Sequence, residues 1–280
     1  MFHTQRRIVA AALAGLTVIA VTGCGSGTVK TPTPVPGASQ GGDLTIGISF
    51  DQPGLGLKTG DTYSGFDVDT ATYVAQALGV QPGNITWKEA NPANRENLLT
   101  SGQVDLVFST YSITDQRKEV VDFAGPYFEA HQDLLVRRNE EDITNPETLN
   151  GRVLCSVSGT TSSAYIKDHY KGEIALQEFP KYSDCLAALT ASQVDAVTTD
   201  DVILAGFAAT PEYKGKVRLI GKGFTDEEYG VGVKKGDTAM VEKVNAALKQ
   251  YIDDGSWKAS LKKTVGPSGY DIPSAPTPGS

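Results

Sequence analysis

The chain has 280 residues with a formal net charge of −8, and 40% of its residues are hydrophobic. A chain this acidic without a basic stripe is a poor binder of nucleic acid, so we exclude nucleic acid as a partner. The histidines His3, His131 and His169 are isolated from one another, and no phosphate-binding loop or G-x-S-x-G motif occurs. We therefore expect no metal site, no cofactor and no catalytic constellation.

The first segment predicts export. Two arginines precede an apolar run at 8–21, which is too short to span a bilayer comfortably and is typical of a signal peptide. The run ends in V-T-G-C, which resembles a bacterial lipobox with Cys24 as the lipidated residue. An ordinary signal peptide or a buried helix with an incidental cysteine are the alternatives. We expect a signal peptide at 1–23 and a lipid anchor that holds the protein on the outer face of the cytoplasmic membrane.

Two segments poor in core-forming residues flank the rest of the chain. Residues 24–42 are rich in Gly, Ser, Thr and Pro, and the stretch 267–280 is similar. Such composition predicts a flexible tether and a flexible tail. The roughly 225 residues between them suffice for two compact lobes.

Strands and helices alternate in the first half of this central region. The predicted order is a strand at 43–48, a helix from about 65 to 79, a strand at 85–87, a helix at 94–100 and a buried strand at 104–108. This order predicts parallel strands with helices between them.

The chain then crosses into a second lobe and returns. Predicted strands lie at 133–136, 150–157, 196–198 and 229–233, with helices at 162–169, 182–191, 202–209, 238–253 and 256–263. We expect lobe 1 at 43–126 and 231–266, lobe 2 at 127–230, and hinge strands near 127–131 and 226–230. The predicted fold is two-lobed α/β, each lobe a mainly parallel sheet flanked by helices.

A small anion site is predicted at the end of the buried strand. Four hydroxyl residues, 109–112, follow the strand, and Thr114 offers a helix cap with Arg117 in the first turn behind it. Ligands bind at the carboxyl ends of strands in open α/β sheets, and a guanidinium fork matches a carboxylate. A solvated arginine beside ordinary turn residues is the alternative.

This region resembles a known family. The run G-Q-V-D-L-V-F-S-T-Y-S-I-T-D-Q-R-K-E-V-V-D-F-A-G-P-Y is similar to the signature of the polar amino acid binding proteins of bacterial ABC importers, solute-binding family 3. Similarity extends to G-F-D-V-D at 65–69, S-G-T-T at 158–161 and V-D-A-V-T-T-D at 194–200, and covers roughly residues 43–266. The resemblance implies a two-lobed periplasmic-binding-protein fold of type II, a monomer, and an ABC permease as partner.

The resemblance also assigns ligand groups. It places the α-carboxylate of an amino acid on Arg117, helped by Ser112 and the backbone N–H of Thr161. The ammonium falls to Asp200 and to the carbonyl of Thr110. Asp200 has an alternative role as the cap of the helix that follows, although Asp201 is the expected cap.

Further residues bear on specificity. Resemblance to the glutamate/aspartate-binding branch puts Arg95 on the ligand's side-chain carboxylate, with Lys58 assisting, so glutamate is favoured over aspartate and glutamine. A surface ion pair is the alternative for Arg95. Phe50 and Tyr127 are expected either to wall the ligand's carbon atoms or to pack in the hinge. Asp51, which could serve a cationic ligand, is expected to turn outward or to pair with Lys58.

Cys155 and Cys185 remain after Cys24. An even pair in an exported protein predicts a disulfide, and two buried thiols are the alternative.

Three function classes fit the resemblance. The favoured one is the receptor of an importer, and the second is a sensor that reports ligand occupancy to a membrane signalling partner. The third is a dehydratase acting on prephenate or arogenate, which shares this fold. We expect no enzyme, because the sequence offers no general acid or base beyond the residues assigned to the ligand.

Overall fold

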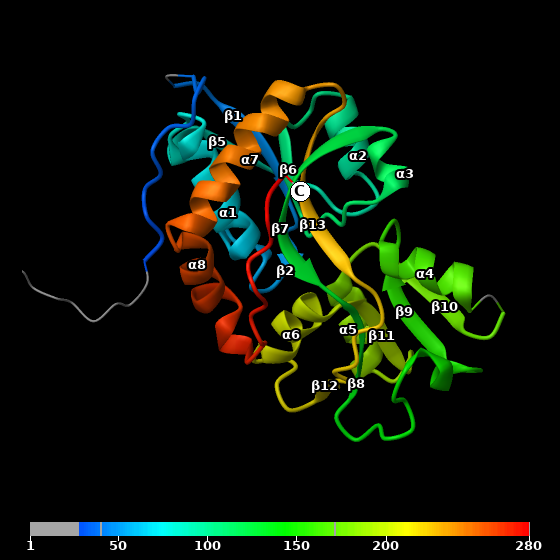
Figure 1. Ribbon diagram of the computed structural model, residues 1–280. Coiled ribbons are helices and arrows are strands. Elements are labelled where there is room, and N and C mark those ends of the chain that lie inside the picture. The colour runs from blue at the N-terminus through cyan, green and yellow to red at the C-terminus, as the bar shows by residue number, and fades with distance from the viewer. Residues whose placement is uncertain (1–27, 40, 171, 280) are drawn as a thin grey trace, which may run out of the picture.

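The structure is a computed structural model that describes residues 28–39, 41–170 and 172–279. The predicted signal peptide, 1–23, and Cys24 lie outside the described residues. Two lobes lie side by side and are joined by a pair of long strands (Figure 1). The expected two-lobed α/β fold is confirmed.

Lobe 1 is built on a five-stranded sheet in the order β5-β1-β6-β13-β7. Its strands are β1 (Leu44–Ile48), β5 (Ile85–Glu89), β6 (Leu106–Phe108), β7 (Val121–Ala130) and β13 (Glu227–Lys234). A separate three-stranded sheet comprises β2 (Asp51–Gln52), β3 (Gly56–Thr59) and β4 (Thr62–Ser64).

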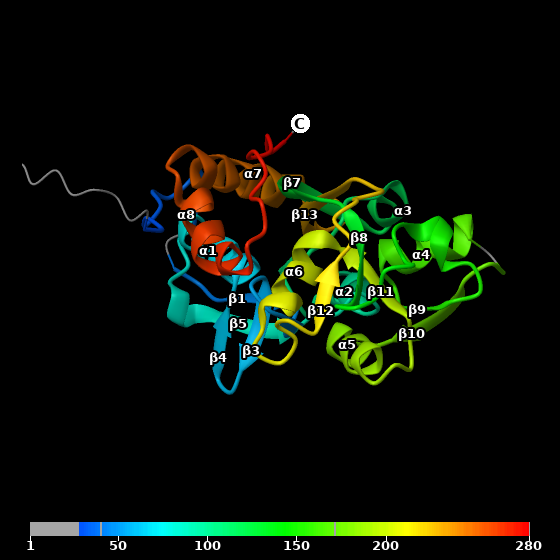
Figure 2. The same ribbon diagram turned by 90° about the horizontal axis from the view of Figure 1, so that it is seen from below.

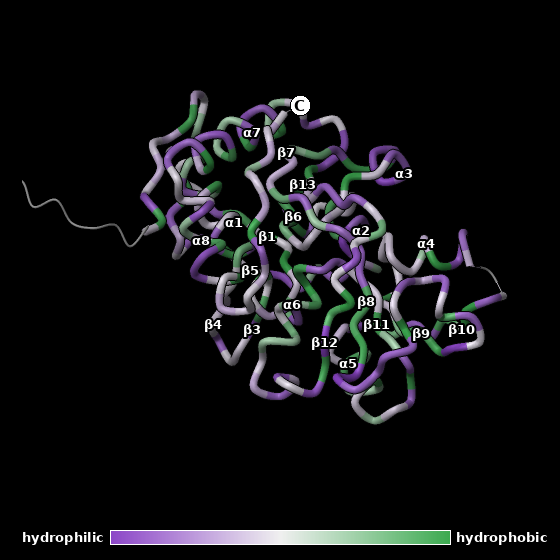
Figure 3. Tube along the Cα trace, turned by 60° about the horizontal axis from the view of Figure 1, so that its bottom comes forward, coloured by the Kyte–Doolittle hydropathy of each residue, from purple (hydrophilic) through white to green (hydrophobic). Residues whose placement is uncertain are grey.

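Helices cover lobe 1. Helix α1 (Phe66–Ala77) packs with α7 (Thr238–Asp253) and α8 (Ser256–Thr264), while α2 (Arg95–Thr100) and α3 (Asp115–Lys118) lie nearer the cleft. The predicted cap forms, because Thr114 Oγ1 accepts from the backbone N–H of Arg117 at 3.2 Å. Figure 3 shows α3 as a hydrophilic segment, whereas the hydrophobic segments concentrate on the strands.

Lobe 2 is one continuous stretch of chain between β7 and β13. Its sheet has the order β10-β9-β11-β8-β12. The strands are β8 (Gln132–Arg137), β9 (Val153–Val157), β10 (Ala175–Phe179), β11 (Ala196–Asp200) and β12 (Val217–Leu219), and the helices are α4 (Thr161–His169), α5 (Tyr182–Thr190) and α6 (Asp201–Ala209). Three short 3-10 helices also occur among the described residues, η1 (Pro82–Asn84), η2 (Pro146–Leu149) and η3 (Gly266–Ser268).

Both large sheets are mixed rather than mainly parallel. In lobe 1, β1 pairs in parallel with β5 and β6, but β13 runs antiparallel to β6 and β7. Lobe 2 repeats this pattern, with β9 parallel to β10 and β11, and β8 antiparallel to β11 and β12. In lobe 1 the antiparallel pairs involve β13, and β13 and its neighbour β7 carry the chain back from lobe 2 and out to it, so these two strands run in opposite directions.

The described parts of the segments expected to be a flexible tether and a flexible tail, 28–39 and 267–279, make contacts with the lobes. Before β1, Val35 is buried, and its backbone N–H donates to the Ala77 carbonyl at 2.9 Å. After α8, the Tyr270 hydroxyl donates to Asp201 of lobe 2 at 3.1 Å, and the Gly279 N–H donates to the Gly125 carbonyl of lobe 1 at 2.8 Å. The tail therefore lies across the hinge, on the side away from β3 and β4 (Figure 2). A few apolar anchors, such as Val35, are enough to dock segments whose average composition is polar.

The predicted disulfide is present in lobe 2. Cys155 on β9 and Cys185 on α5 are bonded, with Cα atoms 5.7 Å apart. The bond joins cysteines 30 positions apart and ties α5 to β9 of the lobe 2 sheet. Within the described residues, no helix has both the length and the apolar character needed to cross a membrane.

Candidate functional site

A small polar cavity lies where the lobes meet. Its volume is about 10 Å³, room for about one water molecule. Lobe 1 lines it with Gln52, Pro92, Arg95, Thr110 and Ser112, and lobe 2 lines it with Thr160, Thr161, Ser162, Tyr182, Thr199, Asp200 and Ile203. Five of the predicted ligand residues, from distant parts of the sequence, therefore line this cavity: Arg95, Thr110, Ser112, Thr161 and Asp200.

A buried carboxylate holds the loop after β6 in place. Thr110 has a φ of 42°, in the left-handed region, and its backbone N–H donates to Asp67 at 3.0 Å. The same carboxylate accepts from the hydroxyl of Tyr127 at 2.7 Å. Burial raises the pKa of Asp67 to about 6. Asp67 and Tyr127 thus support the cavity wall from behind.

Two arginines flank the ring of Tyr111. The guanidinium carbon of Arg95 lies 3.9 Å from the ring centroid, and that of Arg117 lies 5.1 Å from it. Glu96 lies 3.9 Å from Arg95 Nε and 3.6 Å from Arg117 Nε, and accepts from the Tyr111 hydroxyl at 2.7 Å. One carboxylate and one aromatic ring therefore keep two like charges side by side.

Arg95 is almost fully buried, with 2% of its surface exposed. Its Nη1 donates to the Ser109 carbonyl at 2.9 Å, but its Nε has no hydrogen-bond partner among the described residues. An unpaired buried donor is costly, so it marks a place where a ligand atom is expected.

Arg117 lies at the junction of the lobes. Its Nη1 donates to the Ser112 carbonyl at 2.6 Å, and its Nη2 donates across the cleft to the Gly159 carbonyl of lobe 2 at 3.2 Å. Burial, followed by the positive charge of Arg95, lowers the pKa of Arg117 to about 10, so the side chain remains a cation at neutral pH.

Asp200, the carboxylate that lines the cavity opposite Arg95, comes from lobe 2. Asp200 stands at the N-cap position of α6, yet its side chain makes no cap hydrogen bond. Its Oδ2 accepts from the Tyr229 hydroxyl at 2.5 Å, while its buried Oδ1 has no partner in the described part of the chain. Burial, and then the charge of Glu227, raises the pKa of Asp200 well above that of an ordinary carboxyl. Asp201 bonds instead to the backbone N–H groups of His131 and Val202.

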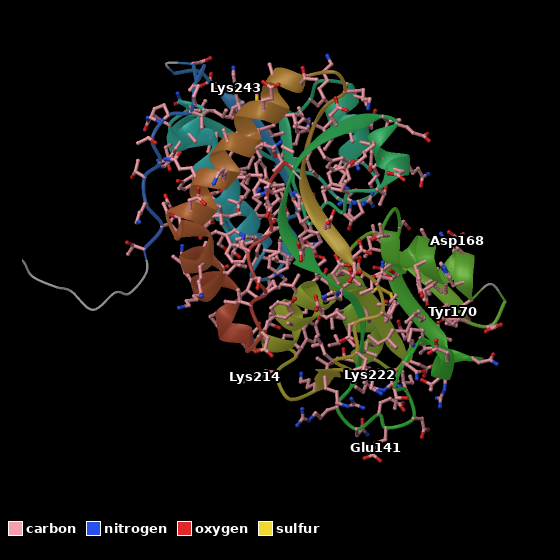
Figure 4. The ribbon with its side chains drawn as sticks, in the orientation of Figure 1. Glu141, Asp168, Tyr170, Lys214, Lys222 and Lys243 are labelled. Atoms are coloured by element: carbon pink, nitrogen blue, oxygen red, sulfur yellow. A yellow bond between two sulfur atoms is a disulfide. The ribbon has the colours of Figure 1, made fainter. Side chains whose placement is uncertain are left out.

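A larger vestibule of about 700 Å³ opens beside the cavity, between α3 and α4. Arg117 lines this vestibule rather than the small cavity, and Thr161 lines both. Glu227 lies on its floor, where it accepts from Gln132 at 2.5 Å and from Thr161 at 3.0 Å. Asp168, labelled in Figure 4, marks the outer rim on α4.

Three predicted ligand residues, Phe50, Lys58 and Tyr127, lie outside both spaces. Lys58 places its ammonium 5.2 Å from the ring centroid of Phe50 and 5.6 Å from that of Tyr63, so it stacks on lobe 1 instead of assisting Arg95. Tyr127 is fully buried in the hinge behind Asp67. Asp51 neither turns outward nor pairs with Lys58, because its Oδ2 accepts from the backbone N–H of Ser183 in lobe 2 at 3.0 Å.

Comparison with known proteins gives consistent results. The glutamate-binding protein GluB of Corynebacterium glutamicum is 41% identical over 92% of this chain and 88% of its own length. The ABC transporter glutamine-binding protein GlnH of Bacillus subtilis is 36% identical over 79% of this chain and 81% of its own length. A solved structure of an ancestral arginine-binding protein bound to arginine has a TM-score of 0.74 at 30% identity, and covers 81% of this chain and 98% of that one.

The profile of the bacterial extracellular solute-binding proteins, family 3, matches residues 44–267. That match spans both lobes and every residue that lines the cavity. The chain belongs to family 3 of the bacterial extracellular solute-binding proteins.

Proposed function

We propose that this protein captures an acidic or polar amino acid, glutamate first, between its lobes and delivers it to an ABC permease from a lipid-anchored position outside the cytoplasmic membrane. One observation carries the proposal. Arg95 Nε and Asp200 Oδ1 are buried, have no hydrogen-bond partner among the described atoms, and belong to residues that line one cavity from opposite lobes. An α-amino acid brings the opposite charges that would satisfy them.

The cleft is closed around a space smaller than an amino acid. Binding therefore requires the lobes to part and to close again around the ligand. The Arg117 Nη2 contact with Gly159 already bridges the lobes, so a ligand carboxylate at Arg117 would join or replace an existing contact. The ligand favours the closed state by the difference between its affinities for the two states.

The position of Arg95 supports an acidic ligand over a basic one. Arg95 lines the cavity opposite Asp200, which is the one carboxylate lining it among the residues described, while Arg117 lies in the adjoining vestibule with Glu96 and Glu227. A receptor for arginine or lysine needs a second acid at the far end of the ligand. The sequence offers Asp51 as the acid that could serve a basic ligand, but its Oδ2 already accepts a hydrogen bond from the backbone N–H of Ser183.

Arg95→Ala tests whether Arg95 makes the protein prefer glutamate to glutamine. Breaking a desolvated charge pair costs on the order of 2–5 kcal/mol, so glutamate affinity should fall by about 30-fold or more. Glutamine should lose less, because its side chain carries no charge. Isothermal titration calorimetry with both amino acids measures this difference.

Lys58→Ala is the matched control, since it removes a cation from the same lobe but outside the cavity. We expect its affinities to match those of the unmodified protein. Equal losses for both ligands in Arg95→Ala, or tight arginine binding by the unmodified protein, would contradict the proposed specificity.

A further inference from the structure

A second set of contacts joins the lobes at the mouth of the cleft, outside the ligand cavity. Asp51, on β2 of lobe 1, accepts from the backbone N–H of Ser183 at 3.0 Å. The next residues of lobe 1 reach α6, since a Cβ atom added to Gly206 would lie 2.1 Å from the Pro53 carbonyl oxygen. In Figure 2 this side is the lower edge of the view, along which β3, β4 and α5 lie, and it is opposite the hinge strand β7.

Helix α5 lacks a cap of its own. Lys181 occupies the N-cap position but makes no side-chain cap hydrogen bond. The first N–H groups of a helix have no partner within the helix, and an N-cap side chain normally accepts from the second or third of them. Ser183 is the second residue of α5, so Asp51 makes from the other lobe the bond that a local cap would make.

The helix that Asp51 contacts carries part of the ligand site. Tyr182, the first residue of α5, lines the cavity, and the hydroxyl of Thr199 donates to its hydroxyl at 2.5 Å. Thr199 directly precedes Asp200. A contact at the start of α5 is thus linked through two residues to the carboxylate assigned to the ammonium.

We propose that Asp51 is a positioning residue that caps α5 across the cleft only when the lobes are closed, and so sets ligand affinity without touching the ligand. This inference rests on the proposed function. Glu89 and Lys181 also bridge the mouth at 3.0 Å, but their side chains are 37% and 44% exposed, and a pair this accessible to solvent contributes little.

The effect should be modest. Burial raises the pKa of Asp51, while its hydrogen bonds with Ser183 lower it, so desolvation offsets part of the gain. Losing a typical N-cap costs ~1 kcal/mol, which corresponds to about a fivefold change in an equilibrium constant.

The experiment compares Asp51→Ala, Asp51→Asn and Glu89→Gln. Calorimetry with glutamate and with glutamine should show Asp51→Ala weaker by about fivefold for both, since the cap acts through closure. Asp51→Asn should stay near the unmodified protein, because an asparagine oxygen also accepts at an N-cap. Glu89→Gln should change nothing. Thermal melting checks that each variant is folded.

Three results would overturn the inference. These are an unchanged affinity in Asp51→Ala, losses that differ between glutamate and glutamine, or an Asp51→Asn as weak as Asp51→Ala. If the unmodified protein binds neither amino acid, the proposed function fails, and small-angle X-ray scattering of ligand-free protein decides the inference instead. A larger radius of gyration in Asp51→Ala than in the unmodified protein supports the cap, and equal radii refute it.

Discussion

The two lobes contribute opposite chemistry to one site. Lobe 1 supplies the cations, Arg95 and Arg117, held by a tyrosine ring and a shared glutamate. Lobe 2 supplies a carboxylate, Asp200, and a set of hydroxyls on the starts of α4 and α5 and the end of β11. Because a zwitterion needs both signs of charge, neither lobe alone makes a complete site. Affinity therefore depends on how well the lobes come together as well as on each ligand contact.

Removing the lobe 1 charge at the junction should have the largest effect. Arg117→Ala leaves a ligand carboxylate desolvated without a cation, and losses of 2–5 kcal/mol correspond to roughly 30- to several-thousand-fold weaker binding. Arg117→Lys should also bind poorly, because an ammonium cannot make two parallel contacts. Calorimetry measures both variants, with the melting temperature as the control for folding. Unchanged affinity in either variant would mean that the carboxylate binds elsewhere.

Blocking the approach of the lobes should weaken binding without touching a charge. Gly206→Ala places a methyl group against the Pro53 carbonyl of the opposite lobe, and overpacking typically costs 1–3 kcal/mol. We expect affinity to fall on the order of tenfold. The helix itself should tolerate the change, because alanine favours a helix more than glycine does.

Gly83→Ala provides the control, since nothing lies within 4 Å of the Cβ position at Gly83. Full affinity in Gly206→Ala would show that the ligand-bound lobes do not pack as closely as they do here.

Titrating the lobe 2 carboxylate should give the smallest effect. The raised pKa of Asp200 means that the ligand-free closed cleft retains a proton to higher pH than an ordinary carboxyl does. A bound ammonium favours the ionised form and lowers that pKa, so binding releases protons. Glutamate affinity should therefore rise by several-fold from pH 5 to pH 8. Calorimetry in buffers of different ionisation enthalpy counts the protons, and the absence of release would contradict this assignment.

Local sequence determined much of this structure. The apolar spacing at 238–253 predicted α7 with its observed bounds, and Thr114 caps α3 as its position indicated. The ligand roles expected for Arg95, Thr110, Thr161 and Asp200, all of which line the cavity, came from the resemblance to the family and not from local pattern. The helix and its cap, by contrast, are signalled within a few neighbouring residues.

Other features depend on contacts between distant residues. Asp51 and Ser183 are 132 positions apart, and their bond exists only because the lobes meet. The sequence position of Lys58 did not show whether it binds the ligand. Its partners in the structure are the rings of Phe50 and Tyr63, which lie on other segments of lobe 1. The mixed sheets follow from the path of the crossing strands, which the strand pattern alone did not show.

Lobe 2 enters the fold as a single uninterrupted segment between β7 and β13, while both docked chain ends belong to lobe 1. Two crossover points are therefore enough to exchange the whole lobe with that of a relative by recombination. Such an exchange would transplant Thr161, Tyr182 and Asp200 together and leave the arginines behind. The lobe 2 residues that line the cavity and the arginines of lobe 1 can then diversify separately. An exchanged lobe 2 must meet one constraint, because its residue at position 201 must still accept the hydrogen bond from the hydroxyl of Tyr270 in the tail.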